Sequence, residues 1–178
     1  LADGRVLVAG GHDGPRRALT IHASAEVYDP LTRTFGRVGD MTVRRHKHDA
    51  VLMRDGRVLV TGGSDERDDR GACASTEIFD PASGRFAIGP SMRQARYKHL
   101  GTSVLLPDGR VLVVGGASGA ESYDPRTGTF TEVRGDARLQ GLFSAVAPLS
   151  AGRVFVSGGY AADAPPTRAA WLYERSVR

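Results

Sequence analysis

The chain has 178 residues, of which 23 are glycine, 7% are aromatic and 25% are charged, and its formal net charge is +4. No apolar run approaches the roughly 20 residues of a membrane-spanning helix, and the single cysteine, Cys73, excludes an intrachain disulfide. The basic excess is modest, and the loops lack interleaved aromatic residues, so the composition argues against a nucleic-acid partner and a membrane partner.

One nine-residue phrase occurs four times along the chain. It consists of an Asp-Gly or Ala-Gly turn, a β-branched run and a pair of glycines. The copies are DGRVLVAGG (3–11), DGRVLVTGG (55–63), DGRVLVVGG (108–116) and AGRVFVSGG (151–159). Repetition at this interval predicts an array of one structural unit. We expect the four glycine pairs to lie at equivalent positions, where the backbone needs positive φ or a close approach.

Each glycine pair is followed by a variable stretch and then by a second phrase. This phrase reads AEVYDPLTRTF (25–35), TEIFDPASGRF (76–86) and AESYDPRTGTF (120–130), and a fourth copy stops at AWLYE (170–174). Short apolar runs at 49–53, 102–106 and 143–149 precede the later glycine phrases. All of these segments are short and punctuated by Gly, Pro and Asp, so each complete repeat predicts four antiparallel strands and no helix.

A single four-stranded sheet cannot bury both of its faces, so several must stack radially as a β-propeller. The strands predict an all-β segment, 1–178, with a partial blade at 1–40, blades at 41–90 and 91–135, and a partial blade at 136–178. Such a set is incomplete. There are three ways to complete the propeller: further polypeptide, self-association with a second copy, or a compact four-bladed ring that lacks two strands.

The glycine doublet, the aromatic residue before Asp-Pro and the second aromatic residue after it resemble Kelch repeats. The Arg-x-x-His pairs, Arg45/His48 and Arg96/His99, fit the same pattern. The repeat pattern is similar to that of bacterial Kelch proteins that are grouped with the propeller of galactose oxidase. One departure is phenylalanine in place of the usual tryptophan. We expect six aromatic residues to be buried between blades: Tyr28, Phe35, Phe79, Phe86, Tyr123 and Phe130.

The galactose-oxidase resemblance implies copper chemistry, which would need a Cys linked to a Tyr, another Tyr and two His ligands. Cys73 falls in a variable loop, and Tyr28 and Tyr123 occupy the structural Tyr-Asp-Pro position. We therefore expect no enzyme activity and no cofactor in this chain. The alternative is an enzyme whose catalytic residues lie outside it.

Topology sorts the loops, because alternate connections of an antiparallel sheet fall on opposite edges. The long, unlike loops share one edge and carry the basic excess, so we expect ligand binding there. The candidate ligand-binding residues are Arg44, Arg45, Lys47, His48, Arg93, Arg96, Lys98 and His99. The opposing interpretation, which we favour for the Arg-x-x-His residues, is that they tie one blade to the next. Arg138 is the third copy's arginine, without a matching histidine.

Two clusters contain residue types that bind metal ions, but their spacing along the sequence does not match known metal-binding patterns. The five histidines show no zinc-ligand pattern, and Asp65, Glu66, Asp68 and Asp69 lack the spacing of an EF-hand loop. The sequence thus predicts a non-catalytic binding or scaffold module for a protein or a carbohydrate/acidic ligand. The sequence does not determine the compartment. We expect a soluble bacterial protein, which is exported if a leader precedes this segment.

Overall fold

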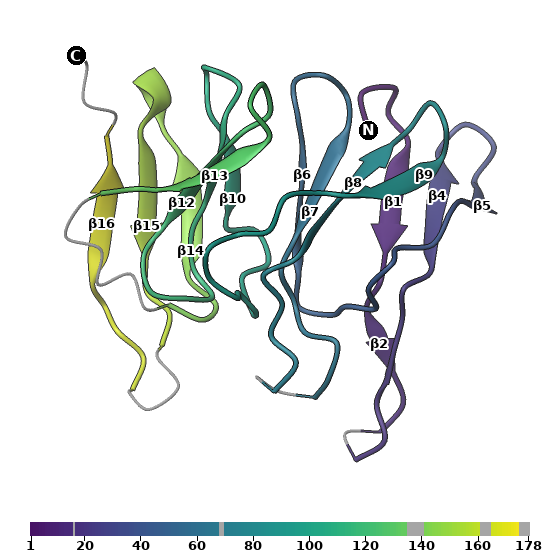
Figure 1. The fold of residues 1–178 in the computed structure, drawn as a ribbon, viewed down its shortest axis with the longest axis horizontal. Helices are drawn as coiled ribbons and strands as arrows, with labels where there is room; N and C mark the ends of the chain where they lie inside the picture. Colours follow the sequence, from purple (N-terminus) through teal and green to yellow (C-terminus); the bar gives the residue numbers. More distant parts are fainter. Residues whose placement is uncertain (16, 68–69, 135–140, 161–164, 175–178) are drawn as a thin grey trace.

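A computed structural model describes residues 1–15, 17–67, 70–134, 141–160 and 165–174. Four antiparallel sheets stand side by side, with the short turns at one end and the long loops at the other (Figure 1). Among the described residues the only helical element is a 3₁₀ turn at Ser150–Gly152. None of the described residues forms a helix that is long and apolar enough to cross a membrane.

The sheets contain three, four, four and three strands in chain order, which confirms the prediction of two complete and two partial blades. Blade 1 consists of β1 (Val6–Ala9), β4 (Ala25–Asp29) and β5 (Thr34–Arg37). Blade 2 consists of β6 (Asp49–Leu52), β7 (Val58–Thr61), β8 (Thr76–Asp80) and β9 (Arg85–Ile88). Blade 3 consists of β10 (Ser103–Leu105), β11 (Val111–Val113), β12 (Glu121–Asp124) and β13 (Thr129–Glu132). Blade 4 consists of β14 (Ala145–Pro148), β15 (Val154–Ser157) and β16 (Ala170–Tyr173). A small hairpin, β2 (His12–Asp13) and β3 (Thr20–Ile21), extends the first long loop.

Blades pack face to face because successive strand residues alternate between the two faces of a sheet. In blade 2, Val58, Val60 and Phe79 form a front face that packs on blade 1. Leu59 and Ile78, on the back face of the same blade, meet blade 3. The same alternation continues into blade 4, so front faces meet back faces at all three interfaces.

The aromatic residues follow this packing only where a neighbouring blade exists. Phe79, Tyr123 and Phe130 are buried as predicted, and Tyr123 and Phe130 have ring centroids 5.0 Å apart. The prediction is wrong for Phe35, whose side chain is 60% exposed. Phe35 belongs to the front face of blade 1, and no described blade packs there. Tyr28 on the same face is half-buried.

The glycine pairs confirm their prediction. All eight glycines have positive φ, between 60° and 96°, and the pairs follow β1, β7, β11 and β15, which are equivalent strands of the four blades. Side chains would also collide at this point: a Cβ at Gly10 would lie 2.5 Å from the Arg45 carbonyl oxygen, and one at Gly63 would lie 2.7 Å from that of His46. Glycine is therefore required where the chain leaves one blade against the linker to the next.

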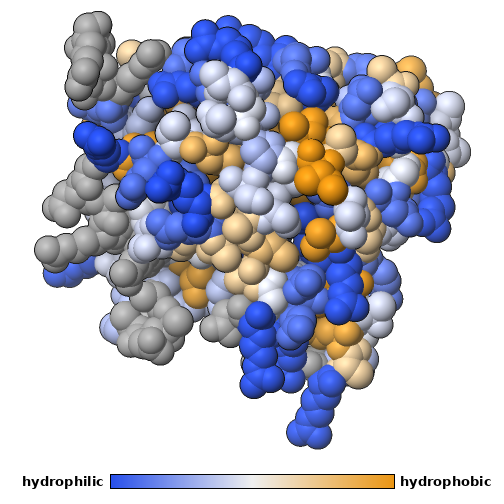
Figure 2. All heavy atoms as spheres, in the orientation of Figure 1, coloured by the Kyte–Doolittle hydropathy of each residue, from blue (hydrophilic) through white to orange (hydrophobic). Residues whose placement is uncertain are grey.

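The innermost strands β6, β10 and β14 lie next to one another. Asp49, at the start of β6, accepts hydrogen bonds from the backbone N–H groups of Gly101, Thr102 and Ser103 at 2.9, 2.9 and 2.7 Å. This buried carboxylate joins blade 2 to the first strand of blade 3. On the side of the molecule shown in Figure 2, hydrophilic residues predominate and apolar residues gather in a small patch near the centre.

Candidate functional site

Arg45 lies in the linker before β6, and its side chain is fully buried. One guanidinium nitrogen, Nη1, donates to the carbonyl oxygens of Gly62 at 2.6 Å and Ser75 at 3.2 Å. The other, Nη2, donates to Glu77 Oε1 at 3.1 Å. The side chain is therefore committed to its own blade.

Arg96 repeats this arrangement in blade 3 and is also fully buried. Its Nη1 donates to the carbonyl oxygens of Gly115 at 2.7 Å and Gly119 at 3.0 Å, and its Nη2 donates to Glu121 Oε1 at 3.1 Å. Burial lowers the pKa of Arg96, and the charge of Glu121 opposes this.

The backbone of each arginine bonds to the preceding blade. Gly11 N–H donates to the Arg45 carbonyl, and Gly63 N–H donates to the Arg96 carbonyl, both at 2.8 Å. Each arginine thus connects two blades, through its main chain on one side and its side chain on the other. This geometry matches the interpretation of these arginines as ties between blades and leaves their guanidinium groups out of reach of a ligand.

The glutamates that complete these ties were missed at the sequence level. Glu77 accepts backbone N–H groups of Thr42 and Val43 at 2.7 and 3.1 Å, in addition to its ion pair with Arg45. Glu121 holds the linker at 93–94 in the same way. The available signal was the glutamate in TEIFD and AESYD, which recurs in register with the arginines.

Three of the histidines, His12, His46 and His99, form hydrogen bonds within the fold. His99 Nε2 is 3.0 Å from the carbonyl oxygen of Thr61, and burial lowers the pKa of His48 and of His99 to about 4. His46 shares a hydrogen bond of 3.2 Å with His12, through Nδ1 of each ring. No group of three or more His, Cys, Asp or Glu side chains among the described residues is placed to bind a metal ion.

The linkers meet at what we call the axial rim, formed by Lys47, Lys98 and Phe143. All three residues have left-handed backbones, with φ of 55°, 54° and 55°. Lys98 N–H donates to the Lys47 carbonyl at 3.0 Å, and Phe143 N–H donates to the Lys98 carbonyl at 2.8 Å. The rim is therefore a repeated backbone structure that carries unlike side chains on the long-loop side.

Aromatic rings surround the Lys98 ammonium. Its Nζ lies 5.2, 5.6 and 5.5 Å from the ring centroids of Tyr97, Phe143 and Tyr160, within cation–π range. It also donates to the Tyr160 hydroxyl at 3.0 Å, and this bond raises the pKa of Lys98. In the described part of the chain, no carboxylate lies within ion-pair distance of this ammonium.

In the structure the eight candidate residues fall into three groups. Lys47 and Lys98 belong to the axial rim. Arg44 and Arg93 are exposed on the linkers, outside the backbone network of the rim. Of the remaining four, Arg45, Arg96 and His99 are fully buried and His48 is half-buried. Arg138, Asp68 and Asp69 fall outside the described residues.

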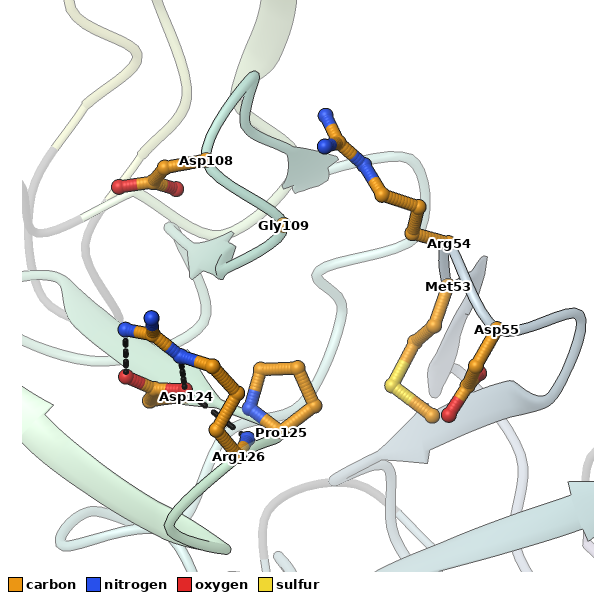
Figure 3. Close-up of a pocket in the computed structure, with 8 residues that line it drawn as sticks. All are labelled: Met53, Arg54, Asp55, Asp108, Gly109, Asp124, Pro125 and Arg126. Atoms are coloured by element: carbon orange, nitrogen blue, oxygen red, sulfur yellow. Dashed lines mark hydrogen bonds and ion pairs between the residues drawn. The ribbon is translucent and has the colours of Figure 1, made fainter.

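The short-turn side has a pocket of about 350 Å³ between blades 2 and 3 (Figure 3). Its charged groups are largely neutralised within the fold. Arg126 bonds Asp124 at 3.0 and 3.2 Å, which lowers the pKa of that carboxyl, and Asp55 pairs with Arg57 at 2.7 Å. Arg54 donates to the carbonyl of Pro107. The carboxylates that line this pocket are thus paired with arginines of the fold, and Arg54 is bonded to a neutral carbonyl oxygen.

Cys73, Tyr28 and Tyr123 do not lie where the copper centre implied by the resemblance would need them. The Cys73 thiol donates to the Gly71 carbonyl, and burial raises its pKa. Tyr28 packs on Phe35 with ring centroids 4.9 Å apart, as Tyr123 packs on its own phenylalanine. Both tyrosines are thus packing residues, and the described residues do not fit such a centre.

Residues 2–42 match the Kelch motif. Two sequences of galactose oxidase from Gibberella zeae are 31% identical to the chain over 118 residues. The match covers 60% of the chain and 16% of each relative, so the chain spans only a small part of the length of the curated relatives it matches.

Proposed function

We propose that this chain, a Kelch-repeat protein folded as blades of a β-propeller, is a non-catalytic module that binds its ligand through the long-loop side. The Kelch motif supports a protein-binding or scaffold role. The ligand is a protein or a carbohydrate/acidic molecule.

The single observation that carries this proposal is a contrast between two sets of residues. The buried arginine–glutamate pairs repeat from blade to blade, whereas the side chains of the axial rim differ. The Arg45–Glu77 pair has the same contacts as the corresponding pair in blade 3, as expected of scaffold residues. At the rim, by contrast, one backbone conformation presents lysine twice and phenylalanine once, beside Tyr160. Variable side chains on a rigid frame are typical of binding surfaces.

A binding array with a matched pair of surface variants tests this proposal. The probes are neutral oligosaccharides, acidic oligosaccharides and glutamate-rich peptides. Lys98→Glu reverses the charge at the rim, and Arg126→Glu reverses a charge at the short-turn pocket. We expect Lys98→Glu to abolish binding of the positive probe and Arg126→Glu to leave it unchanged. Loss through Arg126→Glu alone would move the site to the opposite side and overturn the proposal.

The similarity to galactose oxidase favours a second candidate function. The chain would then be part of a galactose-oxidase-like enzyme, with catalytic residues supplied by polypeptide outside it. Incubation of the purified chain with copper and galactose, with hydrogen peroxide measured, tests whether the chain itself is active. Peroxide release that Cys73→Ser abolishes would contradict the non-catalytic assignment.

Uncovered sheet faces support a proposal about partners. The front face of blade 1 exposes Val6 and Val8, 51% and 49% exposed, and the back face of blade 4 exposes Phe155 and Leu172, 40% and 48% exposed. The corresponding faces of the inner blades are packed against each other, so a further Kelch blade is the occupant that fits. Light scattering distinguishes a second copy from a blade of the same polypeptide. A dimer that Val8→Asp dissociates identifies the second copy.

A further inference from the structure

The Lys98 ammonium differs from the two buried arginines in the groups that surround it. The buried arginines each pair with a glutamate at 3.1 Å, whereas aromatic rings surround Lys98 and its ammonium donates a hydrogen bond to the neutral hydroxyl of Tyr160. Ring faces and a phenol do not cancel a full positive charge. A ligand carboxylate can therefore form the ion pair that the described residues do not supply.

Phe143 offers a flat apolar surface beside this charge. Its side chain is 56% exposed, and its ring centroid lies 6.1 Å from that of Tyr160. Its backbone has φ of 55°, a conformation that costs a residue with a Cβ free energy and that the surrounding hydrogen bonds hold. The backbone beneath the ring is thus held in place, and a sugar ring can lay its C–H face on the exposed ring while its hydroxyl groups remain hydrated.

The backbone of the rim leaves little for an extended peptide to pair with. The Lys98 N–H and carbonyl and the Phe143 N–H are all used between linkers. Leu142 and Tyr160 also exchange both of their backbone hydrogen bonds, at 2.9 and 3.1 Å. Strand addition needs free main-chain groups, so recognition here falls to side chains. This favours a compact ring over an acidic peptide.

We propose that the axial rim binds a uronate, a sugar ring that carries a carboxylate, with the carboxylate on Lys98 and the ring over Phe143. The proposal rests on the proposed function, because it names the ligand class of the same long-loop surface. Tyr97 and Tyr160 hold the ammonium in place, and Tyr160 also supplies a hydroxyl that can bond to the sugar.

Calorimetric titration with trigalacturonate and with its methyl ester tests the proposal, because the two probes differ in charge and share the sugar ring. We expect the acid to bind at least about tenfold more tightly than the ester. Lys98→Met should bring the acid down to the affinity of the ester. Phe143→Ser should weaken both probes by about tenfold. Arg126→Gln, on the opposite side, is the matched control and should change neither affinity.

Melting curves of the variants show whether each remains folded, and Tyr160→Phe gives a milder second test at the same site. Equal binding of acid and ester would overturn the carboxylate pairing. A glutamate-rich peptide that binds in a Lys98-dependent manner while trigalacturonate does not would overturn the sugar class and leave the long-loop module standing. Trigalacturonate binding that responds only to Arg126→Gln would overturn this proposal together with the proposed function.

Discussion

Substitution of Arg96 by alanine tests whether the buried arginine–glutamate ties hold the blades together. The change removes the hydrogen bonds to the carbonyl oxygens of Gly115 and Gly119 and the ion pair with Glu121. It leaves the Glu121 carboxylate, which is 1% exposed, without a counter-charge. Removing one partner of a buried pair typically costs about 3–5 kcal/mol. This is a large fraction of the roughly 5–15 kcal/mol that stabilises a whole domain.

Urea unfolding followed by circular dichroism measures this loss. Arg93→Ala is the matched control, because it changes an exposed arginine of the same linker and should cost less than about 0.5 kcal/mol. Combining Arg96→Ala with Glu121→Gln should cost less than the sum of the two single changes, since the amide no longer carries an unpaired charge. If Arg96→Ala destabilised the chain no more than Arg93→Ala, the interpretation of Arg96 as a tie would be refuted.

Two further predictions concern packing and pH. Phe130→Ala should cost about 3–5 kcal/mol in urea unfolding, whereas Phe35→Ala, at an uncovered face, should cost under about 1 kcal/mol; equal losses would contradict the blade-packing argument. Burial lowers the pKa of His48 and His99 to about 4, so between about pH 6.5 and pH 4 the unfolded chain binds protons that the folded chain does not. Stability should therefore fall as the pH falls through this window, by up to about 3 kcal/mol per histidine. His99→Gln should flatten the profile of unfolding midpoints against pH, and an unchanged profile would count against this assignment.

Local chemistry made the blades predictable from the sequence. The Asp-Gly turn, the valine-rich strand and the glycine pair each impose their own backbone conformation, so four copies of one phrase yield four copies of one structure. Burial was less predictable because it depends on the neighbouring sheet. Phe35 and Phe86 occupy the same position of their repeats, but Phe86 is half-buried against blade 1, whereas Phe35 faces no described blade and is 60% exposed.

The axial rim was predictable only in part. Lys98 stood out as a basic residue of a linker, but Tyr160 lies 62 residues further along the chain and reaches it only through blade stacking. The sequence places Phe143 in an apolar run that leads into a strand. It is exposed instead, because its residue adopts the left-handed backbone that Lys47 and Lys98 adopt in their linkers. A pattern of letters does not reveal that lysine and phenylalanine occupy one structural position.

The arginine tie has a consequence for how the blades come apart. Gly141 takes the position of Arg45 and Arg96 in the linker before blade 4, as its carbonyl accepts the Gly116 N–H, and Trp171 takes the position of the glutamate. Among the described residues, blade 4 is thus held to blade 3 by apolar contacts and backbone hydrogen bonds, and no buried arginine–glutamate pair joins the two. In a row of sheets that each touch only their neighbours, opening begins where the junction is weakest. Amide hydrogens of β15 and β16 should consequently exchange with solvent before those of β7 and β8, giving the molecule a gradient of protection along its own length.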